Sequence, residues 1–278
     1  MDKKDSILSP ILIGSGIAVA ALCGVGLYLY LSKNEEEEES RHLSREAILE
    51  KLDEELKSIV KPEKISAEQN GAQSGMKIYD QEFSKIVYKT LSKYATMMKH
   101  SLNSQSFEQK IEMLRDEDDE GYRKIFFESE KEEISALKKV TDKVLKGIGI
   151  MEQDYVFSLN YHSKDPEFKK ELMAIQEELT QELFTDDEIN PPLPDDLTAE
   201  VAQEIKDFAK ESTERVLREL PQKYRDANIL QNEISFEVAK LDDVIFVKYG
   251  YKNKVVLEAF RKYNLLPQQP GAAMNMPS

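Results

Sequence analysis

Residues 79–102 read YDQEFSKIVYKTLSKYATMMKHSL, and the spacing of the apolar side chains in this stretch decides the fold class. These side chains recur at intervals of three or four positions, which places them on one face of an α-helix. The residues expected on that buried face are Phe83, Ile86, Val87, Leu91, Tyr94 and Met98. Other stretches repeat this spacing, and strand-like runs bounded by turn signals do not recur along the chain. The sequence therefore predicts an all-α fold with several helices.

A helical region is expected over residues 44–184. Its first helix begins near Ser44 and must end before Pro62, because proline cannot continue a helix. Residues 62–75, PEKISAEQNGAQSG, have the composition of a flexible connection. The helix over residues 79–102 follows that connection.

The rest of this region is expected to contain further helices. A shorter helix is predicted around residues 107–114, then an acidic break at 116–121, then a helix over 122–146. Residues 151–162 fit a helix and a strand equally well. Asp165–Glu167 marks a helix start, because a capping carboxylate precedes a proline and an acidic first-turn residue.

An acidic, proline-rich linker is expected at residues 185–197, TDDEINPPLPDDL, which makes two subdomains a natural arrangement. The C-terminal helical region is expected over residues 198–266, with one helix halted by Pro221. Gly250 is placed to cap a later helix in the left-handed conformation, after which the chain reverses. Residues 267–278 are expected to be a disordered tail.

The N-terminal part contains an uncharged stretch, PILIGSGIAVAALCGVGLYLYL, at residues 10–31. As an α-helix its length is roughly 33 Å, enough to cross the hydrocarbon core of a bilayer. Tyr28 and Tyr30 lie near its far end, where aromatic rings favour the headgroup zone. We therefore expect a transmembrane anchor between a short tail, residues 1–9, and an acidic juxtamembrane spacer, residues 32–43.

Neither a cleaved secretory signal nor a matrix presequence fits this stretch as well as an anchor does. A cleaved signal has a shorter apolar core, and here the extreme N-terminus is nearly neutral, with two acidic and two basic residues in residues 2–5. A presequence for the mitochondrial matrix is rich in arginine and poor in acidic residues, which MDKKD is not. The prediction is a retained signal anchor of a single-pass protein.

Small side chains recur at four-residue spacing along the predicted anchor. Such spacing lets two helices approach closely in lipid, so these residues are candidates for packing against another membrane helix. They are Gly14, Gly16, Ala18, Ala20 and Gly24. The alternative is that glycine and alanine are simply frequent in membrane spans.

The membrane itself is suggested by weaker features. Positive charges flank both ends of the span, Lys3 and Lys4 on one side and Lys33 on the other, so orientation is open. A very short tail before a glycine-containing span resembles the signal anchors of the mitochondrial outer membrane. The single cysteine, Cys23, lies inside the span, and no Asn-x-Ser/Thr acceptor occurs. These features favour a mitochondrial membrane over a secretory lumen.

The chain carries 53 acidic and 38 basic residues, a net charge of −15. Nucleic-acid binding depends on Lys and Arg neutralising phosphates, so this charge argues against a nucleic-acid partner. A protein partner with a basic face is favoured electrostatically. The simpler interpretation is that the charge keeps the domain soluble.

The acidic break at residues 116–121, DEDDEG, partly matches a calcium-binding EF-hand loop. Asp116, Asp118 and Glu120 occupy ligand positions, but position 12, where a bidentate glutamate is needed, is Phe127. A solvated acidic loop accounts for the sequence better, and ion binding there is left open.

Other motifs that support catalysis are missing from the sequence. His42, His100 and His162 have no metal-like spacing to other ligands, and no cysteine lies outside the predicted anchor. There is no glycine-rich phosphate loop. We therefore expect no catalytic residue, no metal and no cofactor.

These features together predict a non-catalytic accessory or structural subunit of a membrane protein complex, a scaffold that is not an enzyme. Its partners would be the lipid bilayer, other membrane-protein subunits and a protein that binds the helical domain. The alternative is a membrane-tethered receptor or adaptor that binds protein cargo transiently. An exposed apolar groove would favour that alternative.

Overall fold

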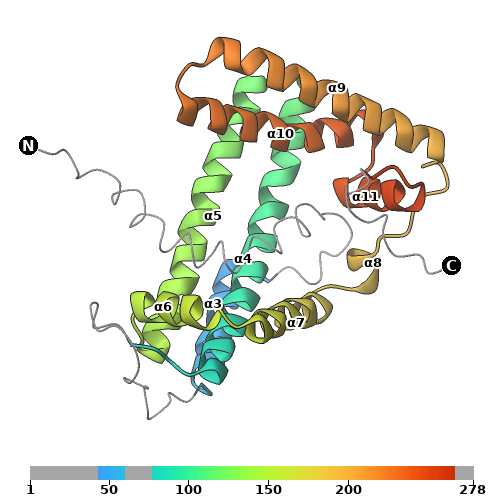
Figure 1. Ribbon diagram of the computed structural model, residues 1–278. Coiled ribbons are helices and arrows are strands. Elements are labelled where there is room, and N and C mark those ends of the chain that lie inside the picture. The colour runs from blue at the N-terminus through green and yellow to red at the C-terminus, as the bar shows by residue number, and fades with distance from the viewer. Residues whose placement is uncertain (1–42, 60–76, 267–278) are drawn as a thin grey trace, which may run out of the picture. The chain divides into compact units, whose positions relative to one another are not determined.

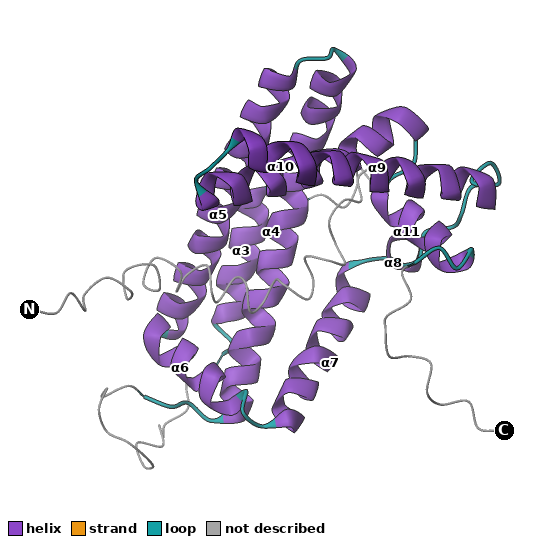
Figure 2. Ribbon diagram, turned by 45° about the horizontal axis from the view of Figure 1, so that its top comes forward, coloured by secondary structure: helices purple, strands orange, loops and turns teal. Residues whose placement is uncertain are grey.

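The computed structural model describes residues 43–59 and 77–266 (Figure 1). Every regular element within these ranges is a helix, which confirms the predicted all-α, multi-helix fold (Figure 2). No helix in these two ranges combines the length and the apolar character needed to cross a bilayer. The predicted anchor at residues 10–31 lies outside them.

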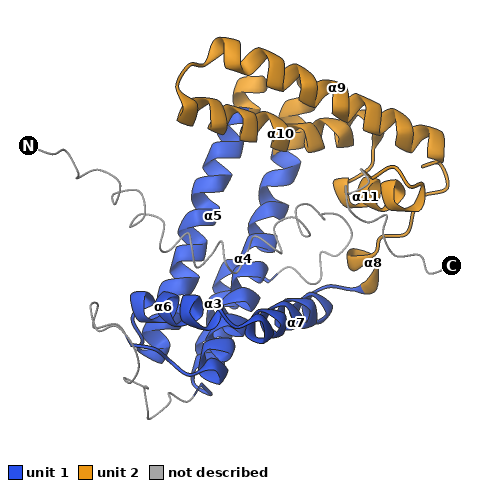
Figure 3. Cartoon of the chain, in the orientation of Figure 1, with its two compact units in different colours: residues 1–31, 35–109, 123–185 blue, residues 32–34, 110–122, 186–278 orange. Residues whose placement is uncertain are grey.

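The chain divides into two compact units (Figure 3). In the described ranges, unit 1 contains residues 43–59, 77–109 and 123–185, and unit 2 contains residues 110–122 and 186–266. The division cuts through two long helices, so the turn between them belongs to unit 2. Each unit has an apolar core of its own.

Unit 1 is built from α3 (Arg45–Leu56), most of α4 (Gln81–Arg115) and α5 (Asp119–Ile148), α6 (Glu152–His162) and α7 (Pro166–Leu183). Helix α3 lies against both long helices. Its Asp53 pairs with Lys143 of α5 at 2.7 Å, and Tyr94 of α4 donates a hydrogen bond to Glu55 at 3.0 Å.

The predicted buried face of residues 79–102 is correct except at one position. Phe83, Val87, Leu91, Tyr94 and Met98 are all buried, but Ile86 is 48% exposed. At 100° per residue, Ile86 projects roughly 100° from the centre of the other five. It therefore lies beyond the edge of the apolar stripe.

The two helices predicted between residues 79 and 114 form the single helix α4. The polar residues between them do not break it, because serine hydroxyls bond to carbonyls within the helix. Ser104 donates to His100 O at 3.2 Å and Ser106 to Asn103 O at 3.3 Å. The acidic break is correspondingly short, and Asp118 caps α5 by accepting from Gly121 N at 2.8 Å.

The remaining connections of unit 1 follow local sequence signals. The sequence of residues 151–162 fits a helix and a strand equally well, and in the structure this segment forms helix α6 with Met151 as its N-cap. The predicted helix start is confirmed, since Asp165 accepts a hydrogen bond from Glu167 N and Pro166 opens α7.

Unit 2 contains α8 (Asp186–Ile189), α9 (Ala199–Lys223), α10 (Ala227–Tyr249) and α11 (Asn253–Lys262). Helix α9 continues through Pro221 rather than stopping at it. Proline is tolerated there because the carbonyl it leaves unpaired belongs to Leu217, which is exposed. Gly250 has φ 79° and caps α10 in the predicted left-handed conformation.

Part of the predicted linker packs into the unit 2 core. Leu197 is fully buried, Leu193 packs against the same cluster, and Leu197 O accepts a hydrogen bond from the Tyr263 hydroxyl at 3.0 Å. The segment before α9 is therefore anchored on the α11 side of unit 2.

Candidate functional site

The residues predicted to act in the membrane lie outside the described ranges. Gly14, Gly16, Ala18, Ala20 and Gly24, proposed for helix packing, belong to residues 1–42, as do Tyr28, Tyr30 and His42. Their roles stay predictions. The candidate sites of the protein come from residues 43–59 and 77–266.

The acidic turn at residues 116–121 is used to hold unit 2 together. Asp118 caps α5, and Asp119 accepts from Lys240 Nζ of α10 at 2.6 Å. In the described part of the chain, no three His, Cys, Asp or Glu side chains gather closely enough to hold a metal ion. Two carboxylates of this turn, those of Asp118 and Asp119, thus have hydrogen-bond partners within the protein.

A row of polar side chains on α6 binds the backbone of the segment that leads into α4. Asp154, Ser158 and His162 are spaced four residues apart, so they share one face of the helix. Asp154 Oδ1 accepts from Lys77 N at 3.0 Å, and Ser158 Oγ accepts from Tyr79 N at 2.9 Å. His162 Nε2 lies 2.7 Å from Tyr79 O, to which it can donate.

This row contains the residue types of a serine hydrolase, but the geometry gives it another role. The Ser158 hydroxyl donates to Asp154 O at 2.8 Å rather than to His162, and the side chain is fully buried. Burial, together with the Asp154 charge, raises the pKa of the Tyr79 hydroxyl. A nucleophile needs a base within hydrogen-bond reach and access for substrate. The row instead fixes residues 77–79 on α6.

A second polar cluster is buried in unit 2. The Tyr122 hydroxyl donates to Asp243 Oδ2 at 2.7 Å, and Lys110 Nζ lies 3.7 Å from the same oxygen. Asp243 is 1% exposed. Burial and the Asp243 charge raise the pKa of Tyr122, so its hydroxyl stays protonated and keeps donating. This cluster attaches α10 to the last turns of α4 and the first turn of α5.

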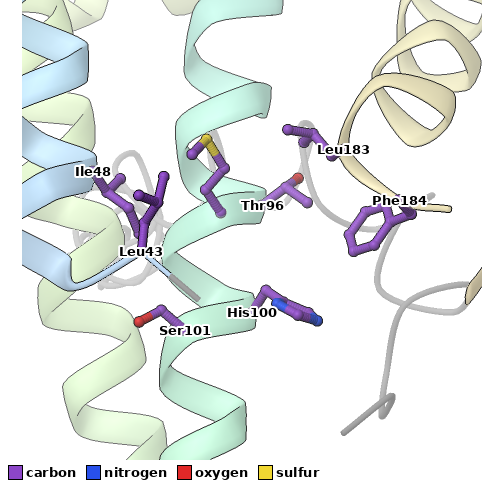
Figure 4. Close-up of a pocket in the computed structure, with 8 residues that line it drawn as sticks. Leu43, Ile48, Thr96, His100, Ser101, Leu183 and Phe184 are labelled. Atoms are coloured by element: carbon purple, nitrogen blue, oxygen red, sulfur yellow. The ribbon is translucent and has the colours of Figure 1, made fainter. Parts of the chain in front are cut away.

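One groove of unit 1 opens between α3, α4 and the end of α7 (Figure 4). It is open to solvent, its cavity volume is about 100 Å³, and its walls expose somewhat more apolar than polar surface. The lining residues are Leu43, Ile48, Thr96, Met97, His100, Ser101, Leu183 and Phe184.

His100 and Phe184 meet at one side of this groove, with ring centroids 5.6 Å apart and the rings nearly perpendicular. Figure 4 shows both side chains between α4 and the end of α7. Apolar walls with a few polar groups are a common lining of binding sites. His100 lines this groove, whereas His162 is bonded inside unit 1.

Sequence reasoning missed both polar clusters. The spacing of Asp154, Ser158 and His162 is visible in the sequence, but their shared partner, the backbone of residues 77–79, lies about eighty positions away. Tyr122 and Asp243 are likewise 121 positions apart.

No protein-family model matches the chain, and neither a curated protein nor a solved structure shows significant similarity to it.

Proposed function

We propose that this chain is a non-catalytic accessory subunit of a membrane protein complex in a mitochondrial membrane. The anchor at residues 10–31 would hold it in the bilayer, and the helical units would bind a partner subunit in water. Restricting the units to a surface raises their effective concentration for that partner.

The observation that carries this proposal is the way buried polar side chains are used. Asp154 and Ser158 bond to the backbone of their own unit, and Asp243 bonds to Tyr122. Groups that another fold would use for acid–base chemistry here stabilise helix contacts, which supports a binding role. The net charge of −15 supports a partner with a basic face.

The test is the native size of the endogenous protein after extraction in mild detergent, with co-migrating proteins identified by mass spectrometry. The proposal expects stoichiometric migration with one large membrane complex. Migration near its own mass of 31.9 kDa plus detergent would contradict it.

The anchor is tested separately by replacing Gly16 and Gly24 with leucine. Insertion should be retained because the span stays apolar, while association with the complex should weaken because the helices can no longer approach closely. Association that is unchanged would show that this face makes no helix contact. A matched control replaces Leu22 and Leu29 with isoleucine, which keeps the span apolar and changes the side of the predicted helix away from Gly16 and Gly24.

A second candidate is a membrane-tethered receptor or adaptor, and the groove lined by Met97, Leu183 and Phe184 favours it. A receptor would occur mainly free and would capture cargo transiently. Met97→Asp places a charge on the groove wall and should abolish capture of cross-linked cargo while leaving membrane insertion intact. If the same variant leaves cargo capture unchanged, the groove is not the binding site.

A further inference from the structure

Both halves of α7 form ion pairs with α4, including Lys85–Glu171 in the first half, but they differ in how they meet the unit 1 core cluster. In the first half, Phe168 is buried in the unit 1 core, and Leu172 and Ile175 pack against that core. From Gln176 onward, hydrogen bonds and ion pairs join α7 to α4. Leu179 is buried, but it lies outside the core cluster.

The amide of Gln176 occupies the middle of this polar contact. Its Nε2 donates to the Tyr88 hydroxyl at 2.8 Å and to Ser92 Oγ at 2.9 Å. Within the described ranges its Oε1 is buried without a hydrogen-bond partner, as is Ser84 Oγ on the same side of α4. A buried network that is only partly satisfied stabilises a contact less than an apolar one.

Two ion pairs flank the second half of α7. Lys89 Nζ lies 2.7 Å from Glu178, and Lys93 Nζ lies 2.7 Å from Glu182. Burial alone lowers the pKa of Lys93, but its bonds to Glu182 and Glu55 and their charges outweigh burial and raise it. Salt weakens such pairs, most strongly the more exposed Lys89–Glu178 pair.

The end of α7 depends on these pairs for a second reason. Its last turn contains no basic residue and carries Glu182. A negative charge at a helix C-terminus opposes the helix dipole. Without Lys89 and Lys93, the last two turns of α7 would therefore fray.

We propose that residues 176–184, the second half of α7 and its C-cap Phe184, form a reversible arm, which detaches from α4 while residues 166–175 stay docked. Detachment removes Leu183 and Phe184 from the wall of the groove and uncovers Ser92 and Thr96 of α4. The groove is therefore gated by ionic strength, or by a partner that competes for Lys89 and Lys93. Residues 176–184 are also the last part of unit 1 before the chain enters unit 2 at Asp186.

The test is hydrogen exchange of the full-length protein in detergent, followed by mass spectrometry at 50 and 500 mM NaCl. Exchange in residues 176–184 should become about tenfold faster at high salt, because two screened pairs are lost together. Residues 166–175 should keep their protection. The double variant Lys89→Ala/Lys93→Ala should exchange quickly in the arm at both salt concentrations.

The matched control is Lys143→Ala, which removes an ion pair between α3 and α5 and should leave the arm unchanged. Equal protection along all of α7 at both salt concentrations would overturn the proposal. So would faster exchange throughout unit 1 in the double variant, because the arm would then not move independently.

Discussion

Unit 1 and unit 2 are both helical, but they are stabilised differently. Among the described residues, the unit 1 core cluster contains eighteen buried apolar residues, and the unit 2 cluster contains six, two of them alanine. Each unit also buries a hydrogen-bonded carboxylate, Asp154 in unit 1 and Asp243 in unit 2, and Asp243 has Lys110 nearby as well as Tyr122. Apolar burial is the larger source of stability, whereas a buried charged pair mainly fixes one arrangement. We infer that unit 2 opens at a lower free energy than unit 1.

The largest expected effect is in the core of unit 1. Leu91→Ala removes a side chain that is 2% exposed and leaves a cavity, so it should lower the free energy of unfolding of unit 1 by about 3 kcal/mol. Chemical denaturation monitored by hydrogen exchange in residues 81–109 measures this. Ile134→Ala is the control, because Ile134 is 52% exposed and its loss should cost less than about 0.5 kcal/mol. A similar loss in both variants would show that the apolar core around Leu91 is not the source of unit 1's stability.

The second-largest expected effect is a loss of stability in unit 2. Asp243→Ala leaves the Tyr122 hydroxyl buried without its acceptor, so it should destabilise unit 2 by about 2 kcal/mol. Hydrogen exchange in α9 to α11 should accelerate, while peptides of α3 and α6 keep their protection.

Asp207→Ala is the control for that variant, since Asp207 is exposed on α9 and accepts a hydrogen bond from Gln203 of the same helix. Its effect should be within about 0.5 kcal/mol. If Asp243→Ala accelerates exchange equally in both units, they unfold as one, and the two units do not differ in how they are stabilised.

The sequence predicted helices well where apolar periodicity was strong, because that pattern depends on neighbours three or four residues away. It located the buried face of α4 for this reason, and it located the start of α7 from the local signal at Asp165–Glu167. Helix ends were less predictable, as at Ser104 and Pro221, because a hydroxyl or an exposed carbonyl can remove the expected break. The contacts of Ser158 and Asp243 could not be predicted, since each pairs with a residue more than seventy positions away.

A smaller effect tests the polar row on α6. Ser158→Ala removes the acceptor for Tyr79 N, and a buried N–H without a partner should cost unit 1 about 1 kcal/mol. The midpoint of denaturant unfolding of unit 1 measures the change. Ser129→Ala is matched to it, because Ser129 donates to Phe126 O in its own helix and its loss should be nearly neutral. Equal midpoints for the two variants would show that the row does not hold residues 77–79.

The smallest expected effect is a difference between the two units in how their stability changes with pH. Burial lowers the pKa of Lys254 in α11 to about 8, despite the nearby Glu188 and Glu258, whereas an unfolded lysine titrates at about 10.4. Between these two values the unfolded state holds more protons than the folded state, so the stability of unit 2 should rise with pH. In unit 1, burial raises the pKa of Tyr79 and of Tyr94, so their contribution is constant below about pH 10 and is lost above it.

Unit 2 should therefore be slightly more stable at about pH 9.5 than at about pH 7.5, while the tyrosines of unit 1 give no such gain. Hydrogen exchange at the two pH values, corrected for intrinsic rates, measures both units in one sample. Because Lys254 is only partly buried, solvent screening keeps the gain small. Lys254→Met should abolish the rise, and Lys210→Met, at an exposed position of α9, should retain it. A rise that persists in Lys254→Met would mean that another group of unit 2 titrates in this range, so that burial of Lys254 does not set the difference between the units.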